Sequence, residues 1–272
     1  MKSFIIIILI TTQLFSSEFI NLAAVPWKSK NDLTKLYKPL IELLEEKTNK
    51  KVNFFITKDY NELSKRIDRK SVDIAIFGAN SYVEAKNKNP KLLYLATCMV
   101  PTDHYFSLII SRKDSGIKTL KQLKNKNFAF TDKGSTSGYV YPKLMLHNDK
   151  IDIQTHFKTI SMLGKHYKIY NAVATKSIDA GGCSISGLQQ AIEKNGDIYH
   201  IIKKSKPIPQ DPIIAAPHLK KEFIKELRFI FANANKSTLF SKYNSQLKGV
   251  SVKSDSFYDT IRISRKFLEE NQ

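Results

Sequence analysis

Short apolar segments alternate with amphipathic segments along most of this chain, and this alternation restricts the possible fold more than any other feature. Apolar runs typical of strands occupy residues 18–26, 51–57, 72–78, 91–100, 105–112 and 127–131. Between them, apolar residues recur at helical spacing, as at Leu33, Leu36, Leu40 and Leu44. Strands that alternate with helices are typical of α/β domains, so the sequence predicts an α/β fold with mainly parallel sheets.

Residues 1–17 differ from the rest of the chain. Lys2 and Ser3 precede the apolar run FIIIILI, and small residues follow up to Ser17. A cationic start, a short apolar run and a small-residue end are typical of a secretory signal peptide, and the run is too short for a mature transmembrane helix. We therefore expect residues 1–17 to be a signal peptide that is removed on export, leaving a soluble protein.

The chain carries a formal charge of +19 at pH 7, which on its own is compatible with nucleic acid, a membrane surface or anionic solutes as partners. Its lysines are scattered through segments such as KNKNPK and KQLKNKN, without a long basic block or a nucleic-acid-binding motif. We interpret them as a solvated surface and expect no nucleic-acid partner. An exported protein that binds DNA or cell surfaces is an alternative that rests on charge alone.

The cysteines and histidines do not form a recognisable metal site. Cys98 and Cys183 lie in apolar or small-residue stretches, which suits buried free thiols at least as well as a disulfide in an exported protein. The histidines show no His-x-x-x-His spacing, and the cysteines no Cys-x-x-Cys spacing. We expect neither a metal ion nor a cofactor.

The segment FTDKGSTSGYVYPKLML, residues 130–146, contains three consecutive hydroxyl residues between two glycines: Ser135, Thr136 and Ser137. It follows a predicted strand and begins a predicted helix. Free N–H groups at a helix N-terminus, together with hydroxyl donors, can bind an anion. An N-cap uses only one hydroxyl, so capping alone does not account for three. Anion binding and simple capping are both open at this point.

Catalytic interpretations of the same segment do not fit it. GSTSG has the outline of a nucleophile elbow, but Thr136 occupies the position of the required serine. A phosphate-binding loop of the Walker type needs Gly-Lys-Ser/Thr, whereas Gly138 is followed by Tyr139. We therefore do not expect an enzyme.

Several motifs, taken in order, resemble the phosphonate, phosphite and phosphate substrate-binding proteins of ABC transporters, within the type II periplasmic-binding superfamily. The motifs are AAVPW, KDYNELSKRIDRKSVDIAIFGANSYVEA, DHYFSLIISRKDS, STSGYVYP, GKHYKIYNAVATKSIDA and KPIPQDPI. The resemblance implies two α/β lobes with a ligand cleft between them. It places residues 18–102 and 205–272 in lobe 1 and residues 103–204 in lobe 2, with crossings near 100–104 and 202–205.

The resemblance also implies a set of ligand contacts. Ser135, Thr136 and Ser137 match a turn that donates hydrogen bonds to an anion's oxygens, and His166 matches a histidine that reaches the same oxygens. Two cleft tyrosines, an acidic residue facing the ligand and two residues that open a helix complete the set: Tyr60, Tyr105, Asp211, Ser81 and Tyr82. Taken singly, such tyrosines are more typical of packing, and an aspartate before proline is more typical of a turn.

Two positions bear on which anion is bound. The carboxylate of Asp211 can only accept hydrogen bonds, so it favours a ligand that retains a P–OH group and disfavours sulfate. Relatives that bind aminoalkylphosphonates have a carboxylate after the strand corresponding to residues 177–182, whereas Ser186 lies near that position here. The resemblance therefore favours phosphate, phosphite or a simple alkylphosphonate as the ligand.

From the resemblance we expect a monomeric periplasmic solute-binding protein that captures a small phosphorus oxyanion by lobe closure and delivers it to an ABC permease in the inner membrane. A ligand-sensing module of a receptor or two-component system with the same fold is one alternative. A binder of another small anion is the other.

Overall fold

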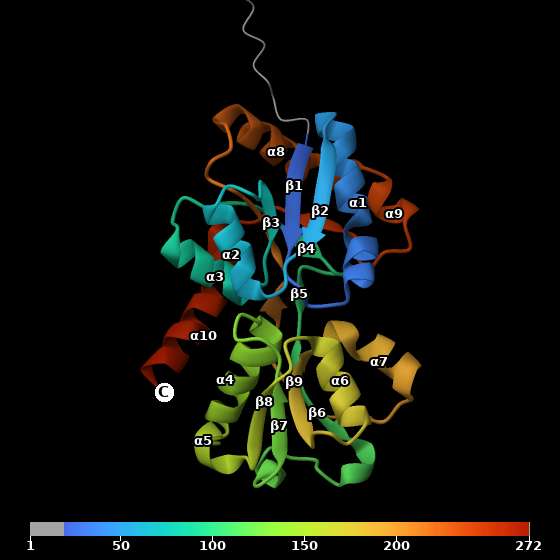
Figure 1. Ribbon diagram of the computed structural model, residues 1–272, viewed down its shortest axis with the longest axis vertical. Coiled ribbons are helices and arrows are strands. Elements are labelled where there is room, and N and C mark those ends of the chain that lie inside the picture. Colours follow the sequence, from blue (N-terminus) through green and yellow to red (C-terminus); the bar gives the residue numbers. More distant parts are fainter. Residues whose placement is uncertain (1–18, 272) are drawn as a thin grey trace, which may run out of the picture.

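A computed structural model describes residues 19–271 and shows two lobes, each built around one β-sheet (Figure 1). This arrangement confirms the predicted two-lobed α/β fold. The predicted signal peptide lies outside the described residues. Within residues 19–271, no helix combines the length and the apolar character needed to cross a membrane.

The first lobe combines the two ends of the chain in one six-stranded sheet. In spatial order its strands are β13 (Gly249–Ser251), β4 (Leu93–Met99), β12 (Pro212–Ala215), β3 (Ile74–Ile76), β1 (Phe19–Ala24) and β2 (Lys51–Ile56). Strands β1 to β4 run in one direction, while β12 and β13 oppose them. The helices of this lobe are α1 (Lys30–Thr48), α2 (Tyr60–Asp68), α3 (Ala79–Lys88), α8 (Lys221–Asn233), α9 (Leu239–Lys242) and α10 (Asp259–Glu270).

The second lobe contains a five-stranded sheet from the middle of the chain. Its strands are, in spatial order, β10 (Tyr199–Lys204), β6 (Ser107–Arg112), β9 (Ala180–Ser184), β7 (Asn127–Phe130) and β8 (Thr159–Met162). Strands β7 to β10 run in one direction and β6 opposes them, so most strands of each sheet point the same way, as predicted, whereas β12 and β6 pair antiparallel with both of their neighbours. The helices here are α4 (Tyr141–Asn148), α5 (Ile153–His156), α6 (His166–Ala174) and α7 (Leu188–Asn195).

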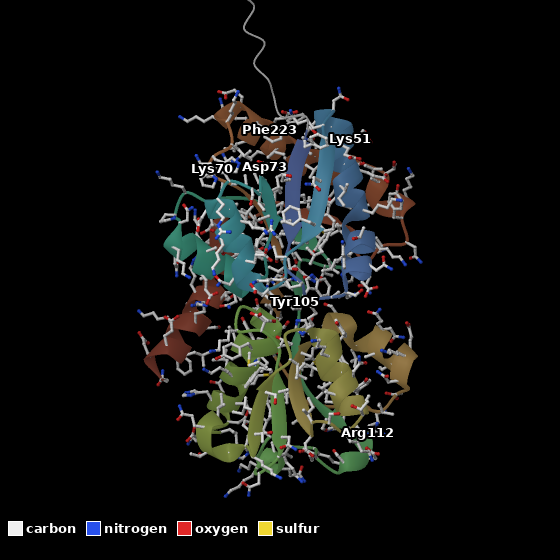
Figure 2. All side chains as sticks on the ribbon, viewed as in Figure 1. Lys51, Lys70, Asp73, Tyr105, Arg112 and Phe223 are labelled. Carbon is white, nitrogen blue, oxygen red and sulfur yellow. The ribbon has the colours of Figure 1, made fainter. Side chains whose placement is uncertain are left out.

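A short antiparallel ribbon joins the lobes. It pairs β5 (His104–Tyr105) with β11 (Ile208–Pro209), and Figure 2 shows Tyr105 between the lobes. The predicted second crossing at 202–205 overlaps the end of β10, which pairs with β6 up to Lys204, and the chain reaches the ribbon at Ile208. The run 105–112 is likewise not one strand: it is divided at Phe106, where the chain leaves the ribbon and enters the second sheet.

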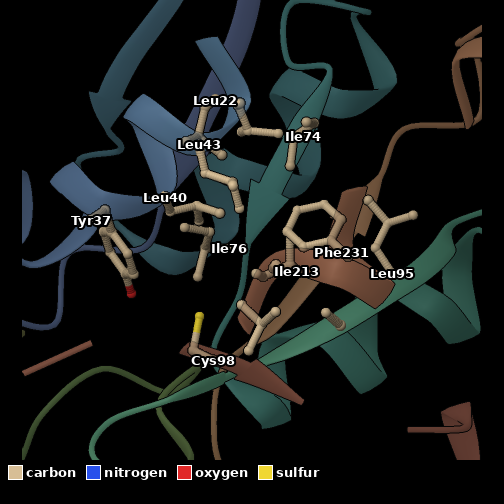
Figure 3. Packing of buried hydrophobic residues seen from close by; sticks show 14 of the residues in the cluster. Leu22, Tyr37, Leu40, Leu43, Ile74, Ile76, Leu95, Cys98, Ile213 and Phe231 are labelled. Atoms are coloured by element: carbon tan, nitrogen blue, oxygen red, sulfur yellow. The ribbon is translucent and has the colours of Figure 1, made fainter. Parts of the chain in front are cut away.

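Helix α1 provides much of the core of the first lobe. It begins after Ser29, whose hydroxyl oxygen accepts a hydrogen bond from the N–H of Asp32 at 3.2 Å and so caps the helix. Its apolar face packs on the sheet, with Leu40 and Leu43 near Ile76 (Figure 3). Replacing a buried leucine such as Leu40 with alanine is expected to cost about 2–5 kcal/mol of unfolding free energy.

The two cysteines are buried and unpaired. Cys98 lies in β4 of the first sheet and Cys183 in β9 of the second. The structure thus agrees with the interpretation as buried free thiols rather than a disulfide.

Candidate functional site

A pocket of about 330 Å³, here called the inner pocket, lies where the two lobes face each other. The first lobe and the residues next to the ribbon contribute Trp27, Tyr60, Gly78, Tyr105, Gln210 and Asp211. The second lobe contributes Ser135, Thr136, Ser137, His166, Ser184 and Ser186. Most of these residues lie at or just beyond the carboxyl end of a strand, the edge at which α/β sheets commonly bind ligands.

The inner pocket includes all but two of the residues that the sequence comparison singled out. Ser81 and Tyr82 lie outside it. The Ser81 hydroxyl donates to the carbonyl oxygen of Gly78 at 3.0 Å, and the Tyr82 hydroxyl donates to a carboxylate oxygen of Asp255. Successive helical residues point about 100° apart, so opening a helix at the pocket does not aim every side chain into it. Tyr82 instead packs edge-on against Tyr258, with ring centroids 5.3 Å apart.

The three hydroxyl residues have different surroundings. Ser135 is the N-cap of a π-helical turn, Thr136–Val140, that leads into α4, and its Oγ accepts from the N–H of Gly138 at 3.1 Å. Thr136 Oγ1 accepts from the backbone N–H of Asn80, in the opposite lobe, at 2.8 Å. Ser135 is also hydrogen-bonded to Tyr60, and Thr136 and Ser137 to Tyr105, so the three hydroxyls and the two tyrosines face the same space. Capping therefore explains Ser135 but not its two neighbours.

His166 presents a hydrogen-bond donor to the inner pocket. Its Nδ1 accepts from the backbone N–H of Ser184 at 3.0 Å, so in the neutral ring the proton is on Nε2. Burial, and then the positive charge of Lys28, lower the pKa of His166 to about 3, which keeps the ring neutral at pH 7. Nε2 lies 3.5 Å from Ser135 Oγ, so the imidazole and the hydroxyl turn face the same space.

Asp211 carries the one carboxyl group among the residues that line the inner pocket. Burial raises its pKa to about 7. Burial also raises the pKa of Tyr60 and of Tyr105, and the negative charge of Asp211 raises both further. Near neutral pH the two tyrosines are therefore protonated and can donate, while Asp211 exchanges between a protonated and an ionised form.

Direct contacts across the pocket show that the lobes are closed on each other. The side-chain amide of Asn80 donates to the carbonyl oxygen of Gly134 at 3.1 Å. A Cβ atom at Gly134 would lie 2.5 Å from Tyr60 Cβ, so glycine allows this approach. Helix α10 contacts both α3 and α4, and Figure 1 shows it extending from the first lobe beside the second.

Five residues of the inner pocket were not among the predicted contacts: Trp27, Gly78, Ser184, Ser186 and Gln210. Trp27 and Gly78 follow β1 and β3, and Ser184 ends β9. Their position after a predicted strand was a usable signal. Gln210 gave no such signal, because it follows the ribbon strand β11, and its amide donates to the carbonyl oxygen of Val100 at 2.8 Å.

The arrangement suits a small oxyanion. Hydroxyl groups, the imidazole N–H of His166 and the N-terminus of α6, which has no side-chain cap, supply donors, and Asp211 supplies one acceptor. No cluster of three or more histidine, cysteine or acidic residues suited to a metal ion occurs within residues 19–271.

Comparison with known proteins places the chain in a family. A family model described as "ABC transporter, phosphonate, periplasmic substrate-binding protein" matches residues 22–257. The chain is 30% identical over 230 residues to the "Phosphate-import protein PhnD" of Mycolicibacterium smegmatis, covering 79% of this chain and 71% of that protein. It is 28% identical over 227 residues to the "Phosphonates-binding periplasmic protein" of Escherichia coli, covering 80% of this chain and 67% of that protein.

Solved structures share the fold. The binding protein of an ABC phosphonate transporter from Pseudomonas aeruginosa superposes with a TM-score of 0.80 at 24% identity, covering 92% of this chain and 86% of that one. PhnD1 of Prochlorococcus marinus, solved in complex with methylphosphonate, gives a TM-score of 0.81 at 19% identity, covering 93% of this chain and 98% of that one. Together with the sequence match, these results show that the chain belongs to the family of periplasmic substrate-binding proteins of phosphonate ABC transporters.

Proposed function

We propose that this protein captures a small phosphorus oxyanion (phosphate, phosphite or a simple alkylphosphonate) in the inner pocket and delivers it to an ABC permease. The single observation that carries the proposal is the placement of the hydroxyl turn and the His166 N–H around one space with Asp211. Residues 18–102 and 205–272 act as one lobe and residues 103–204 as the other. The protein works as an exported monomer, without catalysis and without nucleic acid.

Capture follows from closure of the lobes around the ligand. Ser135, Thr136, Ser137 and His166 belong to one lobe, while Tyr60 belongs to the other. A ligand that bridges them binds the closed form better than the open form and shifts the equilibrium toward closure. Closure also excludes water, which strengthens each hydrogen bond to the anion.

The binding role can be tested with the protein's own fluorescence. Trp27 is the single tryptophan of the chain and lines the inner pocket. We expect saturable changes in its emission when phosphate, phosphite or methylphosphonate is added to ligand-free protein. Titrants that leave the emission unchanged, from protein whose circular dichroism shows it to be folded, would argue against this function.

Ser186 is expected to limit binding of aminoalkylphosphonates. It lines the inner pocket, where Asp211 is the one carboxyl among the lining residues. The Ser186→Glu variant should therefore gain about tenfold or more in affinity for 2-aminoethylphosphonate, because a charge-assisted hydrogen bond contributes about 1.5–3 kcal/mol. Affinity for methylphosphonate should fall through repulsion. Titration of the matched variant Ser186→Gln, which adds similar bulk without charge, should show neither effect.

A further inference from the structure

A second pocket, of about 720 Å³ and here called the outer pocket, adjoins the inner pocket. The two share Trp27, His166 and Ser184 as a common boundary. The exposed surface of the outer pocket is mostly apolar, and its polar groups come from Lys28, Ser29, Asp32, Asn171, Gln190 and Lys194. Inorganic phosphate would fill none of this space, so the outer pocket bears on the identity of the ligand.

The outer pocket lies where a substituent on phosphorus would leave the inner pocket. In the proposed function the hydroxyl turn and Asp211 bind the oxygens of a phosphonate or phosphate monoester, so the remaining group on phosphorus would have to point elsewhere. The boundary formed by Trp27, His166 and Ser184 belongs to both pockets and offers that direction. Trp27 and Tyr167 supply aromatic surface for a short carbon chain.

The charges of the outer pocket favour an anionic group. Lys28 and Lys194 face one acidic residue, Asp32, whose carboxylate already accepts from the Ser29 hydroxyl at 2.7 Å. The Lys28 ammonium donates to Gln246 Oε1 at 2.9 Å and lies 5.0 Å from the centre of the Trp27 ring, next to the shared boundary. Burial lowers the pKa of Lys28, which indicates that nearby acidic groups do not fully compensate its charge.

We propose that the outer pocket holds the organic substituent of a phosphonate or phosphate monoester, and that Lys28 favours a substituent carrying a carboxylate. The proposal rests on the proposed function of the inner pocket and narrows it, because it names a class of larger ligands beyond phosphate and phosphite. The chain would distinguish among organophosphorus compounds by the charge at the far end of the substituent.

The test compares substituents that share a two-carbon spacer but differ in end group. Ligand-free protein is titrated with methylphosphonate, propylphosphonate, 2-carboxyethylphosphonate and 2-aminoethylphosphonate. We expect 2-carboxyethylphosphonate to bind about tenfold more tightly than propylphosphonate, and 2-aminoethylphosphonate to bind most weakly. In Lys28→Gln the ratio of carboxyethyl to propyl affinity should fall to about one, whereas Lys118→Gln, on an exposed part of the second lobe, should keep the wild-type ratio.

A second variant tests whether the substituent occupies the outer pocket, independently of the charge of Lys28. Gln190 is an exposed residue of the outer pocket, so Gln190→Trp should fill it without disturbing a core. Propylphosphonate and 2-carboxyethylphosphonate should lose affinity in this variant while methylphosphonate does not. If methylphosphonate binds to wild-type protein but the carboxyethyl compound is no tighter than propylphosphonate, the inference is wrong and the proposed function stands. If none of phosphate, phosphite and methylphosphonate binds, both are wrong.

Discussion

Replacing Gly134 with alanine is expected to lower the affinity for the ligand by about 10- to 100-fold. The added Cβ would lie 2.5 Å from Cβ and 3.0 Å from Cγ of Tyr60, which belongs to the opposite lobe. Overpacking of this kind costs about 1–3 kcal/mol, and here the cost falls on the closed form alone. The open form separates the two residues, so the variant should fold normally and close poorly.

Two measurements separate this effect from a folding defect. The melting temperature of ligand-free Gly134→Ala should remain within a few degrees of the wild-type value, while the increase in melting temperature on adding ligand should be much smaller. Gly138→Ala provides the contrast, since its Cβ would lie 1.9 Å from Thr131 Oγ1 within the second lobe and should destabilise the ligand-free protein too. Wild-type affinity in Gly134→Ala would show that closure does not bring these residues together.

Replacing Asp211 with asparagine is expected to remove discrimination against sulfate and to change the pH dependence of binding. The complex needs one proton between Asp211 and the ligand, because two facing anionic groups would repel each other. The pKa of Asp211 is raised to about 7 by burial, and the second pKa of a phosphoryl group is near 6. Wild-type affinity for methylphosphonate, whose dianion has no P–OH group, should therefore fall about tenfold per pH unit above about 7, since the complex must take up a proton.

The asparagine variant carries its own N–H donors and needs no shared proton. Its affinity for phosphate or methylphosphonate should stay level above pH 7, and sulfate should bind about tenfold or more tightly than to the wild-type protein. Calorimetric titrations of both proteins from pH 6 to pH 9 measure these effects. Parallel pH profiles, or continued rejection of sulfate by the variant, would rule out this role for Asp211.

The same carboxyl group should affect the stability of the closed form, in which it is buried. Its pKa in the folded state, about 7, is above the ordinary value of 3.8, so the folded protein holds a proton that the unfolded chain releases. Its stabilising contribution is fully present below pH 3.8 and is lost as the pH rises through about 7. As the pH rises through about 7, the unfolding free energy of the wild-type protein should fall relative to that of Asp211→Asn. Denaturant titrations of both proteins at several pH values measure this difference.

The sequence was most informative where short segments determine their own structure. The spacing of Leu33, Leu36 and Leu40 predicted α1, and the strand before Thr131 predicted that the hydroxyl turn would lie at the edge of a sheet. Helical spacing and strand–turn–helix order are local properties, so one sequence is enough to detect them.

Features that depend on pairing between distant segments were not predictable in the same way. Strand β12 is inserted between β3 and β4, which precede it by more than a hundred residues, and β13 is identified by its pairing with β4. Nothing in three residues such as Gly249–Ser251 specifies a strand on its own. The ribbon strand that contains Tyr105 is likewise defined by its partner β11.

The prediction that the pocket residues lie close together came from the family resemblance, not from any local sequence pattern. Tyr60 and Asp211 lie 151 positions apart and meet only in the folded chain. Tyr82 shows the limit of transferring contacts by position, because the rotation of α3 directs its hydroxyl to Asp255.

The central claim, that the closed lobes hold a phosphorus oxyanion, is tested most directly by calorimetric titration of protein freed of ligand by unfolding and refolding. Phosphate, phosphite, methylphosphonate and sulfate are added separately at pH 8, where Asp211 is ionised. The account predicts saturable binding, one ligand per chain, for at least one of the first three and no heat with sulfate. Absence of heat with all three phosphorus compounds from folded, empty protein, or binding of sulfate with equal affinity, would contradict it.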